Sequence, residues 1–360
     1  MKGDASDTVI IGGGVIGLAL AVELRLRGQD VTVLSRKPQE AAALAAAGML
    51  APEAEGLSEG PLLSLGLRSR DLYPDWIGKL EYLTDLSAGY WPCGILAPVF
   101  EAPEVISDQG SWLEAEALRE FQPGLGPEVT GAWWRPEDAQ VDNRRLMTVL
   151  QTAAERLGVN VQAGVTVTAL SSRGGKLKGV ETDAGTFLAQ NYVLASGAWA
   201  SELLPLAVFP VKGEMLALQM PPQENGAWPL ERVLFGPGTY LVPRRDGRLI
   251  IGATVEVGNW SAHNTPQGVQ TLVERATRLY PGLASWPLQE IWWGFRPGTP
   301  DEGPLLGAGP WENLTLATGH YRNGVLLAPV TARLLADWLT AGKSDPLLEA
   351  FSYRRFEDSA

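Results

Sequence analysis

Residues 8–17 decide the fold, and they read Thr8-Val9-Ile10-Ile11-Gly12-Gly13-Gly14-Val15-Ile16-Gly17. A β-branched run stops at the first glycine and a run with helical spacing follows, which predicts strand, turn and helix. In the spacing Gly12-x-Gly14-x-x-Gly17, the first glycine permits the tight turn and the second lets backbone approach a pyrophosphate. The third lets the helix pack closely on the strand. A pyrophosphate would then lie at the positive end of the helix dipole. This context predicts a dinucleotide site rather than an ordinary glycine turn.

The second strand of this unit, residues 31–34, ends in residues that depart from the usual pattern. An acidic residue normally stands there and binds the ribose hydroxyls. This chain has Ser35, followed by Arg36 and Lys37. Ser35 can still form one hydrogen bond with a ribose. The basic pair could grip a 2′-phosphate, which would indicate NADP, or could be a solvated turn beside an adenosine, which we favour.

Length, charge and cysteine content limit the class of protein. The chain has 360 residues, 45% of them hydrophobic, which is enough for two domains or one domain with a large insertion. Its net charge of -12, without a long Lys/Arg run, argues against nucleic-acid binding. The single cysteine, Cys93, excludes an internal disulfide, and two distant histidines do not suggest a metal site. Residues 9–24 are interrupted by glycines and too short to span a bilayer, so we expect a cytoplasmic chain without a membrane segment.

The remaining sequence alternates between helical segments and strands. Helices are predicted over residues 41–47, 62–83 (where Pro74 breaks or starts a segment), 141–157 and 325–339. Strands are predicted over residues 159–163, 165–170, 179–182, 187–194, 209–219, 240–243, 248–256, 291–295 and 314–318. This order predicts an α/β fold: a discontinuous Rossmann-like cofactor domain interrupted by an antiparallel β-sheet domain. The cofactor domain comprises residues 1–85, 141–205 and 300–360, and the substrate domain comprises residues 86–140 and 206–299.

Three side chains could bind a small anionic substrate. Arg296 stands between a strand and a Pro-Gly turn, where a rigidly held guanidinium suits bidentate carboxylate binding, although a surface arginine fits equally well. Tyr240 begins a hairpin strand and could be a simple edge aromatic. Arg322 precedes a helix whose first N–H groups could face an anion, or it belongs to an ordinary strand-to-helix turn. The sequence contains no nucleophile elbow, P-loop or zinc-binding HExxH motif.

Over nearly its whole length the chain resembles the D-amino-acid oxidase superfamily, and within it the glycine oxidases linked to thiamine biosynthesis. The resemblance rests on short motifs whose order and spacing are specific. They are Val9-Ile10-Ile11-Gly12-Gly13-Gly14-Val15-Ile16-Gly17, Ala46-Ala47-Gly48-Met49-Leu50, Pro210-Val211-Lys212-Gly213-Glu214, Tyr240-Leu241-Val242-Pro243-Arg244, Gly252-Ala253-Thr254, Gly294-Phe295-Arg296-Pro297-Gly298-Thr299 and Gly319-His320-Tyr321-Arg322-Asn323-Gly324.

The resemblance implies a fold with an FAD domain and an antiparallel substrate domain, and it assigns roles by position. Arg296 corresponds to the arginine that binds the substrate carboxylate, Tyr240 to the tyrosine that contacts it, and Arg322 to an arginine near the active site. The expected cofactor-binding residues include Gly197 of the small-residue turn. The full set is Gly12, Gly14, Val15, Ile16, Gly17, Ser35, Arg36, Gly48, Met49, Val165, Gly197, Asn323 and Gly324. Cys93 does not match a flavin attachment position, so noncovalent FAD is expected. No metal is expected.

The implied reaction is FAD-dependent oxidation of glycine, sarcosine or a small D-amino acid by O2. It would yield a keto acid (glyoxylate from glycine), ammonia and H2O2, and would feed thiazole formation. No side-chain base is obligatory, and His320 is the only tempting candidate. Val255 replaces a methionine of a related enzyme near the substrate, which leaves the pocket size open. A homo-oligomer is compatible with the family, which often forms tetramers. The alternatives are an FAD-dependent D-amino-acid dehydrogenase or sarcosine-type oxidase, an NADP-dependent reductase, and an FAD-bound component without oxidase activity.

Overall fold

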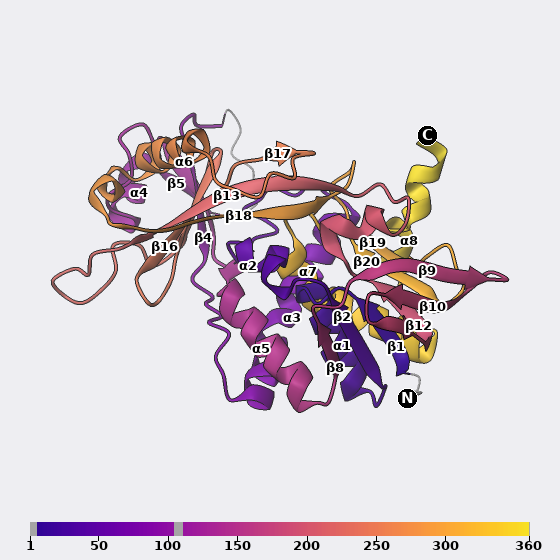
Figure 1. The fold of residues 1–360 in the computed structure, drawn as a ribbon. Coiled ribbons are helices and arrows are strands. Elements are labelled where there is room, and N and C mark those ends of the chain that lie inside the picture. Colours follow the sequence, from indigo (N-terminus) through magenta and orange to yellow (C-terminus); the bar gives the residue numbers. More distant parts are fainter. Residues whose placement is uncertain (1–5, 104–110, 360) are drawn as a thin grey trace.

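The computed structural model describes residues 6–103 and 111–359, and a six-stranded sheet forms the core of its right-hand half in Figure 1. The strand order is β19-β20-β12-β1-β2-β8, and neighbours are parallel except β19 and β20. The predicted strand–helix–strand unit is present as β1 (Ser6–Ile11), α1 (Val15–Leu26) and β2 (Val31–Ser35). The other strands are β8 (Asn160–Ala163), β12 (Ala189–Leu194), β19 (Leu305–Ala308) and β20 (Leu314–Thr318).

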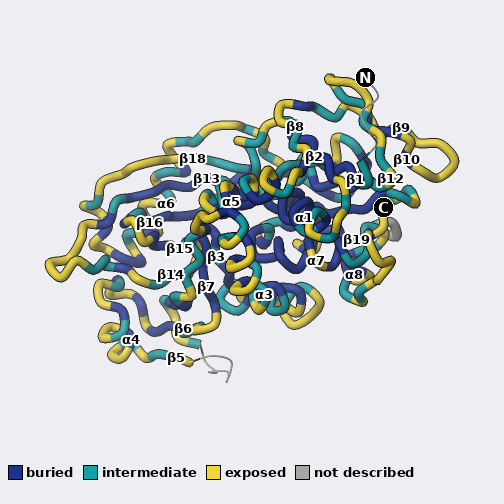
Figure 2. The backbone as a smooth tube through the Cα atoms, turned by 90° about the horizontal axis from the view of Figure 1, so that it is seen from below, coloured by how far each residue is buried: buried dark blue, intermediate teal, exposed yellow. Residues whose placement is uncertain are grey.

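Both faces of this sheet are covered, because its strands carry apolar residues on alternate sides. One face, with Ile10 and Val33, packs against helices α1, α3 (Pro61–Thr84), α5 (Asn143–Arg156) and α7 (Gly324–Ala341). The other face, with Val9 and Leu34, packs against a three-stranded sheet of β9 (Val167–Arg173), β10 (Lys176–Thr182) and β11 (Gly185–Phe187). Figure 2 shows the buried backbone concentrated around α1, β1 and α7.

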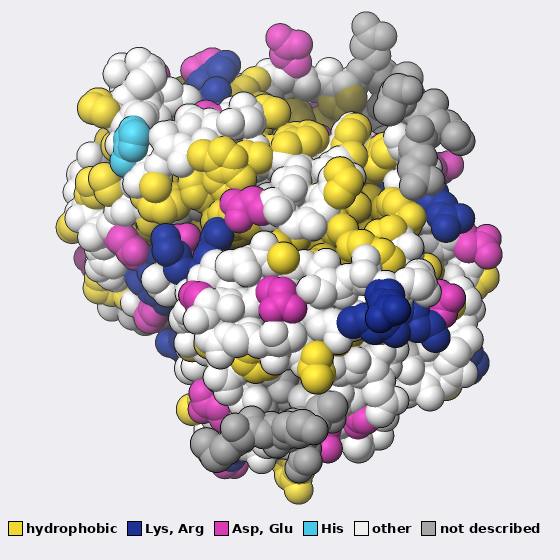
Figure 3. Space-filling model, turned by 45° about the vertical axis from the view of Figure 1, so that its right-hand side comes forward, with side chains coloured by type: hydrophobic (Ala, Val, Ile, Leu, Met, Phe, Trp, Pro, Cys, Tyr) yellow, Lys and Arg dark blue, Asp and Glu magenta, His cyan; other side chains and the backbone are white. Residues whose placement is uncertain are grey.

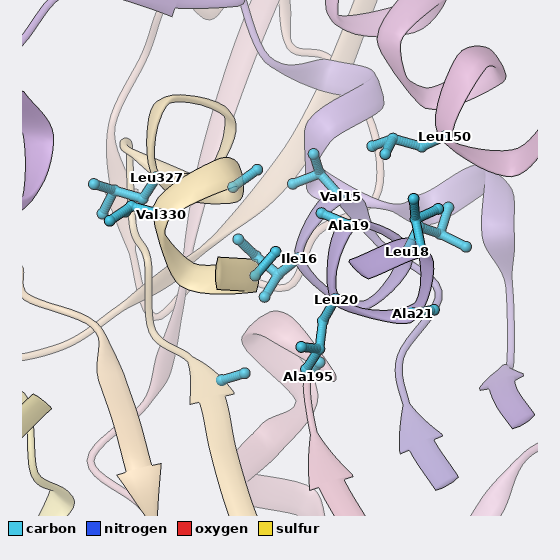
Figure 4. Close-up of a cluster of buried hydrophobic side chains, with 14 of the residues drawn as sticks. Val15, Ile16, Leu18, Ala19, Leu20, Ala21, Leu150, Ala195, Leu327 and Val330 are labelled. Carbon is cyan, nitrogen blue, oxygen red and sulfur yellow. The ribbon is translucent and has the colours of Figure 1, made fainter. Parts of the chain in front are cut away.

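Helix α1 lies between α5 and α7 in this core. Figure 4 shows its side chains, among them Ile16 and Leu20, between Leu150 of α5 on one side and Leu327 and Val330 of α7 on the other. Among helices of the described residues, α7 alone is long and apolar enough to cross a membrane. It packs against α1 and α3, so its apolar composition matches its place in the core.

A nine-stranded, mostly antiparallel sheet forms the second large element. Its order is β17-β13-β16-β15-β14-β4-β6-β5, with β18 also paired to β13. The strands are β4 (Ile95–Val99), β5 (Ser111–Glu114), β6 (Gly131–Arg135), β13 (Phe209–Gln219), β14 (Val233–Gly236), β15 (Thr239–Pro243), β16 (Arg248–Gly252), β17 (Glu256–Val257) and β18 (Leu288–Gly298). Helices α4 (Ala115–Phe121) and α6 (Pro266–Leu279) supply apolar residues to the core beneath this sheet.

Short elements complete the described chain. The strands β3 (Met49–Leu50) and β7 (Ala139–Gln140) form a two-stranded sheet, and α2 (Ala42–Ala45) and α8 (Pro346–Ala350) are short helices. The 3-10 helices are η1 (Pro38–Glu40), η2 (Gly197–Glu202), η3 (Pro281–Ser285) and η4 (Tyr353–Ser359). On the face shown in Figure 3, Lys and Arg side chains lie in small groups with Asp and Glu side chains nearby.

The predicted α/β fold with a parallel sheet and an antiparallel sheet is confirmed, whereas the domain boundaries stay a prediction. Several element boundaries were wrong. Of residues 41–47, only Ala42–Ala45 are helical, because Met49 and Leu50 pair with β7 and draw the chain into extended structure. Pro74 does not interrupt α3, since it lies on the exposed side, where water can satisfy the freed carbonyl. The strand predicted at residue 165 starts at Val167, and residues 187–194 divide between β11 and β12.

Candidate cofactor and substrate site

A cavity of about 530 Å³ lies between the carboxyl end of β1, the start of α1 and the strands β15, β16 and β18 of the nine-stranded sheet. The predicted site residues converge on it from segments far apart in the sequence. Those that line it are Gly12, Gly14, Val15, Ile16, Ser35, Arg36, Gly48, Met49, Val165, Gly197, Tyr240, Arg296, Arg322 and Gly324. Gly17 and Asn323 lie behind the wall, Gly17 in the first turn of α1 and Asn323 at the N-cap of α7.

The three glycines of the opening motif have the geometry that a dinucleotide turn requires. Gly12 adopts φ +123°, and a Cβ there would lie 2.2 Å from the carbonyl oxygen of Ala195. A Cβ on Gly17 would lie 1.9 Å from the carbonyl oxygen of Gly12, so only glycine allows this approach of helix and strand. Gly14 faces open space, and the N-terminus of α1 that it caps receives no side-chain hydrogen bond. The turn therefore fits a pyrophosphate, which free N–H groups and the helix dipole attract.

The basic residues after β2 are engaged within the protein. Arg36 donates to Glu202 at 3.1 Å, and Lys37 forms an ion pair with Glu40 at 2.7 Å. Ser35 is buried at the end of β2 and lines the cavity. These ion pairs favour a solvated turn beside an adenosine over a grip on a 2′-phosphate.

Arg244, which the sequence reasoning did not single out, anchors the cavity loop at residues 47–49. Its side chain is 4% exposed and donates to the Ala47 carbonyl at 2.7 Å, to Gln140 Oε1 at 2.5 Å and to Asn143 Oδ1 at 3.0 Å. Burial lowers the pKa of Arg244 to about 10, so the guanidinium stays charged at neutral pH. One buried cation thus ties the loop to residues 140–143 and to its own hairpin.

At the other end of the cavity, Arg296 and Tyr240 lie next to each other on different strands. Arg296 donates to the Thr254 carbonyl at 3.2 Å. A guanidinium carries five N–H donors, so further donors remain for a carboxylate. Burial raises the pKa of Tyr240, and the nearby Arg296 opposes the rise, so the phenol is neutral and able to donate. Arg322 lines the same region and forms an ion pair with Glu302 at 3.6 Å.

Glu55 is a lining residue that the sequence reasoning missed. Its Oε2 atom is buried and has no hydrogen-bond partner among the described residues. Burial raises the pKa of Glu55 to about 7, although the charges of Arg322 and Arg296 oppose that rise. The signal in the sequence was an acidic residue shortly after the motif at residues 46–50.

His320, the only tempting candidate for a base in the sequence, is poorly suited to that role. It is 2% exposed, its Nε2 atom lies 3.1 Å from the Thr331 hydroxyl, and burial lowers its pKa to about 3. The ring is therefore neutral at physiological pH and a weak proton acceptor. Cys93 is not among the residues that line the cavity. Within residues 6–103 and 111–359, no group of three or more His, Cys, Asp or Glu side chains could hold a metal ion.

Comparison with known proteins identifies the family. A family model described as FAD dependent oxidoreductase (DAO) matches residues 7–338. The bifunctional protein ThiO/ThiG of Synechocystis sp. is 59% identical over 354 residues, which are 98% of this chain and 54% of that protein. The chain therefore spans about half the length of the bifunctional relatives it matches. The glycine oxidase of Bacillus licheniformis is 32% identical over 98% of both chains.

A solved structure has the same fold over nearly the whole chain. The crystal structure of glycine oxidase from Geobacillus kaustophilus superposes with a TM-score of 0.90 at 33% identity, covering 98% of this chain and 99% of that one. The resemblance inferred from the motifs and the prediction of FAD as the cofactor are both confirmed. The chain belongs to the DAO family of FAD-dependent oxidoreductases.

Proposed function

We propose that this protein oxidises glycine and other small amines or amino acids with O2, releasing glyoxylate (or the matching keto acid), ammonia and H2O2. The observation that carries the proposal is the convergence of Arg296, Tyr240 and Arg322 on the cavity that begins at the glycine-rich turn. The name glycine oxidase, borne by one of the relatives, supports the same substrate. The resemblance to glycine oxidases linked to thiamine biosynthesis supports the further proposal that the reaction feeds thiazole formation. We place this reaction in the cytoplasm.

FAD would lie along the cavity, with its pyrophosphate at the N-terminus of α1 and its adenosine near Ser35, Arg36 and Val165. Its ring system would face residues 47–49 and Gly324 at the start of α7. When bound, FAD supplies the acceptor for a hydride from the substrate Cα. Gly17 would act by allowing the close approach of α1 to β1, and Asn323 would act from the N-cap of α7.

The protein's own contribution is to fix the substrate. Arg296 would bind the carboxylate with two parallel hydrogen bonds, and Tyr240 would donate a further one. Held in this way, the substrate would present its Cα–H bond to the flavin ring system near residues 47–49 and Gly324. Orientation of this kind lowers the barrier without a covalent intermediate.

A second function, oxidation or dehydrogenation of sarcosine or a small D-amino acid, uses the same residues. Val255 favours it, because this short side chain stands at the cavity wall, at a position where the family resemblance implies a larger methionine. The extra room could accept an N-methyl group or a short side chain. The ion pairs of Arg36 and Lys37 argue against the NADP-dependent alternative.

A substrate panel tests the proposal. Purified holoenzyme is assayed for peroxide with glycine, sarcosine and D-alanine, and the flavin spectrum is recorded anaerobically with each. We expect bleaching of the flavin by at least glycine, with peroxide in air. Bleaching without peroxide would assign a dehydrogenase, and no bleaching by any of the three would reject amine oxidation.

Gly213 provides a test of how Arg296 is positioned. A Cβ on Gly213 would lie 2.4 Å from Nη1 and 2.5 Å from Nη2 of Arg296. The guanidinium is the end of a flexible side chain, so Gly213→Ala should displace it and leave the strand intact. We expect the KM for glycine to rise about tenfold, equivalent to one lost hydrogen bond to a charged group. Steady-state kinetics and the melting temperature measure this.

The matched control is Gly78→Ala, because a Cβ at that position on α3 meets no other atom within 4 Å. Its KM should equal that of the parent enzyme. A Gly213→Ala enzyme with unchanged KM would show that Arg296 does not bind the substrate.

A further inference from the structure

Amine oxidation by hydride transfer requires a proton acceptor for the substrate. An amino acid in neutral solution carries an ammonium group, whose nitrogen has no free electron pair. That pair must be available to support loss of hydride from Cα. One N–H proton must therefore leave the nitrogen within the cavity or before binding.

Three carboxylates line the cavity, and two of them are already paired. Glu40 is paired with Lys37, and Glu202 with Arg36, both at the end near Ser35. Glu55 is the third, and its Oε2 atom is buried without a hydrogen-bond partner in the described part of the chain. The structure thus leaves one carboxylate oxygen inside the site without a hydrogen bond. A buried oxygen of this kind destabilises the protein unless a ligand donates a hydrogen bond to it.

The charges near enough to act on Glu55 come from several elements. Arg296 of β18 and Arg322 of the turn before α7 are the cations, and Asp138 and Glu302 are the anions. The two cations suit a substrate carboxylate, and Glu55 supplies the negative partner for an ammonium. The cavity end is therefore complementary to a zwitterion rather than to a simple acid.

The segment that carries Glu55 is held firmly. The Ala54 N–H donates to Asp138 Oδ2 at 2.8 Å, and Arg70 bonds to Asp138 Oδ1 at 2.8 Å and also to Glu53. The Glu55 N–H donates to the Ala51 carbonyl at 3.0 Å. Both residues before Glu55 are fixed by this network, which limits the positions that its side chain can reach.

We propose that Glu55 binds the ammonium group of the substrate and removes one of its protons. The N–H bond breaks, its electron pair remains on nitrogen, and the proton forms an O–H bond with the Glu55 carboxylate. No electrons leave the substrate in this step, and the neutral amine that results can support loss of hydride from Cα. This assignment deepens the proposed function because it concerns the same site.

The pH dependence of the reaction follows from the position of this carboxyl. With its pKa raised by burial to about 7, Glu55 is protonated below that pH and cannot accept a proton. We expect kcat/KM for glycine to fall as the pH drops through about 7. In Glu55→Gln only the neutral fraction of free glycine can react. The pH at which kcat/KM falls should therefore move up towards the pKa of the free ammonium group of glycine. At neutral pH, kcat/KM should fall about 100-fold.

Two variants keep this test independent of folding. Glu128→Gln, at an exposed acid that pairs with Arg278 on the surface away from the cavity, is the matched control and should keep the parent pH profile. Glu55→Asp keeps the carboxylate, so its kcat/KM should still fall as the pH drops through the neutral range. Melting temperature and flavin content are measured for all three variants.

A pair of unreactive ligands separates this proposal from the proposed function. 2-Aminoisobutyrate has an ammonium but no Cα–H, and 2-hydroxyisobutyrate replaces that ammonium with a hydroxyl. We expect Glu55→Gln to weaken the first about tenfold or more, as for a lost charged hydrogen bond, and to leave the second unchanged. Binding is followed by the change in the flavin spectrum of the holoenzyme.

Each outcome has a distinct meaning. If the parent enzyme oxidises glycine and Glu55→Gln keeps its pH profile and its ligand preference, the Glu55 assignment is overturned and the proposed function stands. If no amine is oxidised but the ligand pair still separates Glu55→Gln from the parent, the ammonium site stands and the proposed function fails. If the parent binds neither ligand, the Glu55 assignment is overturned as well.

Discussion

Replacing Arg296 with alanine is expected to raise the KM for glycine about 100-fold or more, while FAD stays bound. The variant removes the guanidinium that we propose to bind the substrate carboxylate, beside Tyr240 in the cavity. Loss of one partner of a buried charged pair costs about 2–5 kcal/mol. The cofactor end of the cavity, at the glycine-rich turn, is built from other segments, so its occupancy should not change. Steady-state kinetics and the flavin spectrum of the purified variant measure both effects.

Two further variants make the Arg296 result specific. Arg296→Lys keeps the charge but loses the planar pair of donors, so its KM should lie between those of the parent and the alanine variant. Arg278→Ala removes an arginine that pairs with Glu128 on the surface, and its KM should not change. Parent kinetics in Arg296→Ala would mean that the carboxylate binds elsewhere.

Replacing Arg244 with leucine is expected to weaken FAD binding about tenfold or more and to destabilise the fold by several kcal/mol. The side chain donates to the Ala47 carbonyl, Gln140 and Asn143 inside the protein. Without it these acceptors stay buried and unpaired, at about 1–3 kcal/mol each. The loop at residues 47–49 then loses its anchor, and the cavity wall loses its shape. Flavin retention on dilution and thermal melting measure the two effects.

The neighbouring residue offers the control for this prediction. Arg245 is exposed, and its guanidinium lies 5.2 Å from the centre of the Trp91 ring. Arg245→Leu makes the same chemical change one position along the chain and should leave flavin retention unchanged. Equal loss of flavin in both variants would mean that the effect is a general one of removing charge.

The parts of the site that the sequence predicted are those determined by local chemistry. The turn at residues 12–17 could be recognised because each glycine meets a steric demand set by its immediate neighbours in strand and helix. The hairpin with Tyr240 was predicted from alternation and a turn, and β15 does pair with β16. The predicted partner strand was too long, because β16 ends at Gly252 and not at residue 256. Arg296 and Arg322 gained their assignments from the family resemblance, since each stood at a place where a surface arginine was equally reasonable.

The parts that were missed depend on contacts between distant residues. The pKa of the Glu55 carboxyl depends on its burial and on the charges of Arg296 and Arg322. Both arginines follow it by more than 200 positions in the chain. Arg244 reads as one more polar residue at a hairpin until its partners, 104, 101 and 197 positions away, are known. No local pattern carries such information. The error at residues 41–47 has the same origin, because alanine favours helix and the pairing of Met49 with Gln140 overrides it.

The position of β20 next to β12 affects how the protein is made. β1 and β2 leave the ribosome early, but β20 and the turn before α7, which close one wall of the cavity, are translated some 280 residues later. Nascent chains that stop before α7 can form the glycine-rich turn and yet lack the helix that packs against α1. We therefore expect flavin to be captured late in synthesis, and chains released before residue 324 to be colourless and prone to degradation.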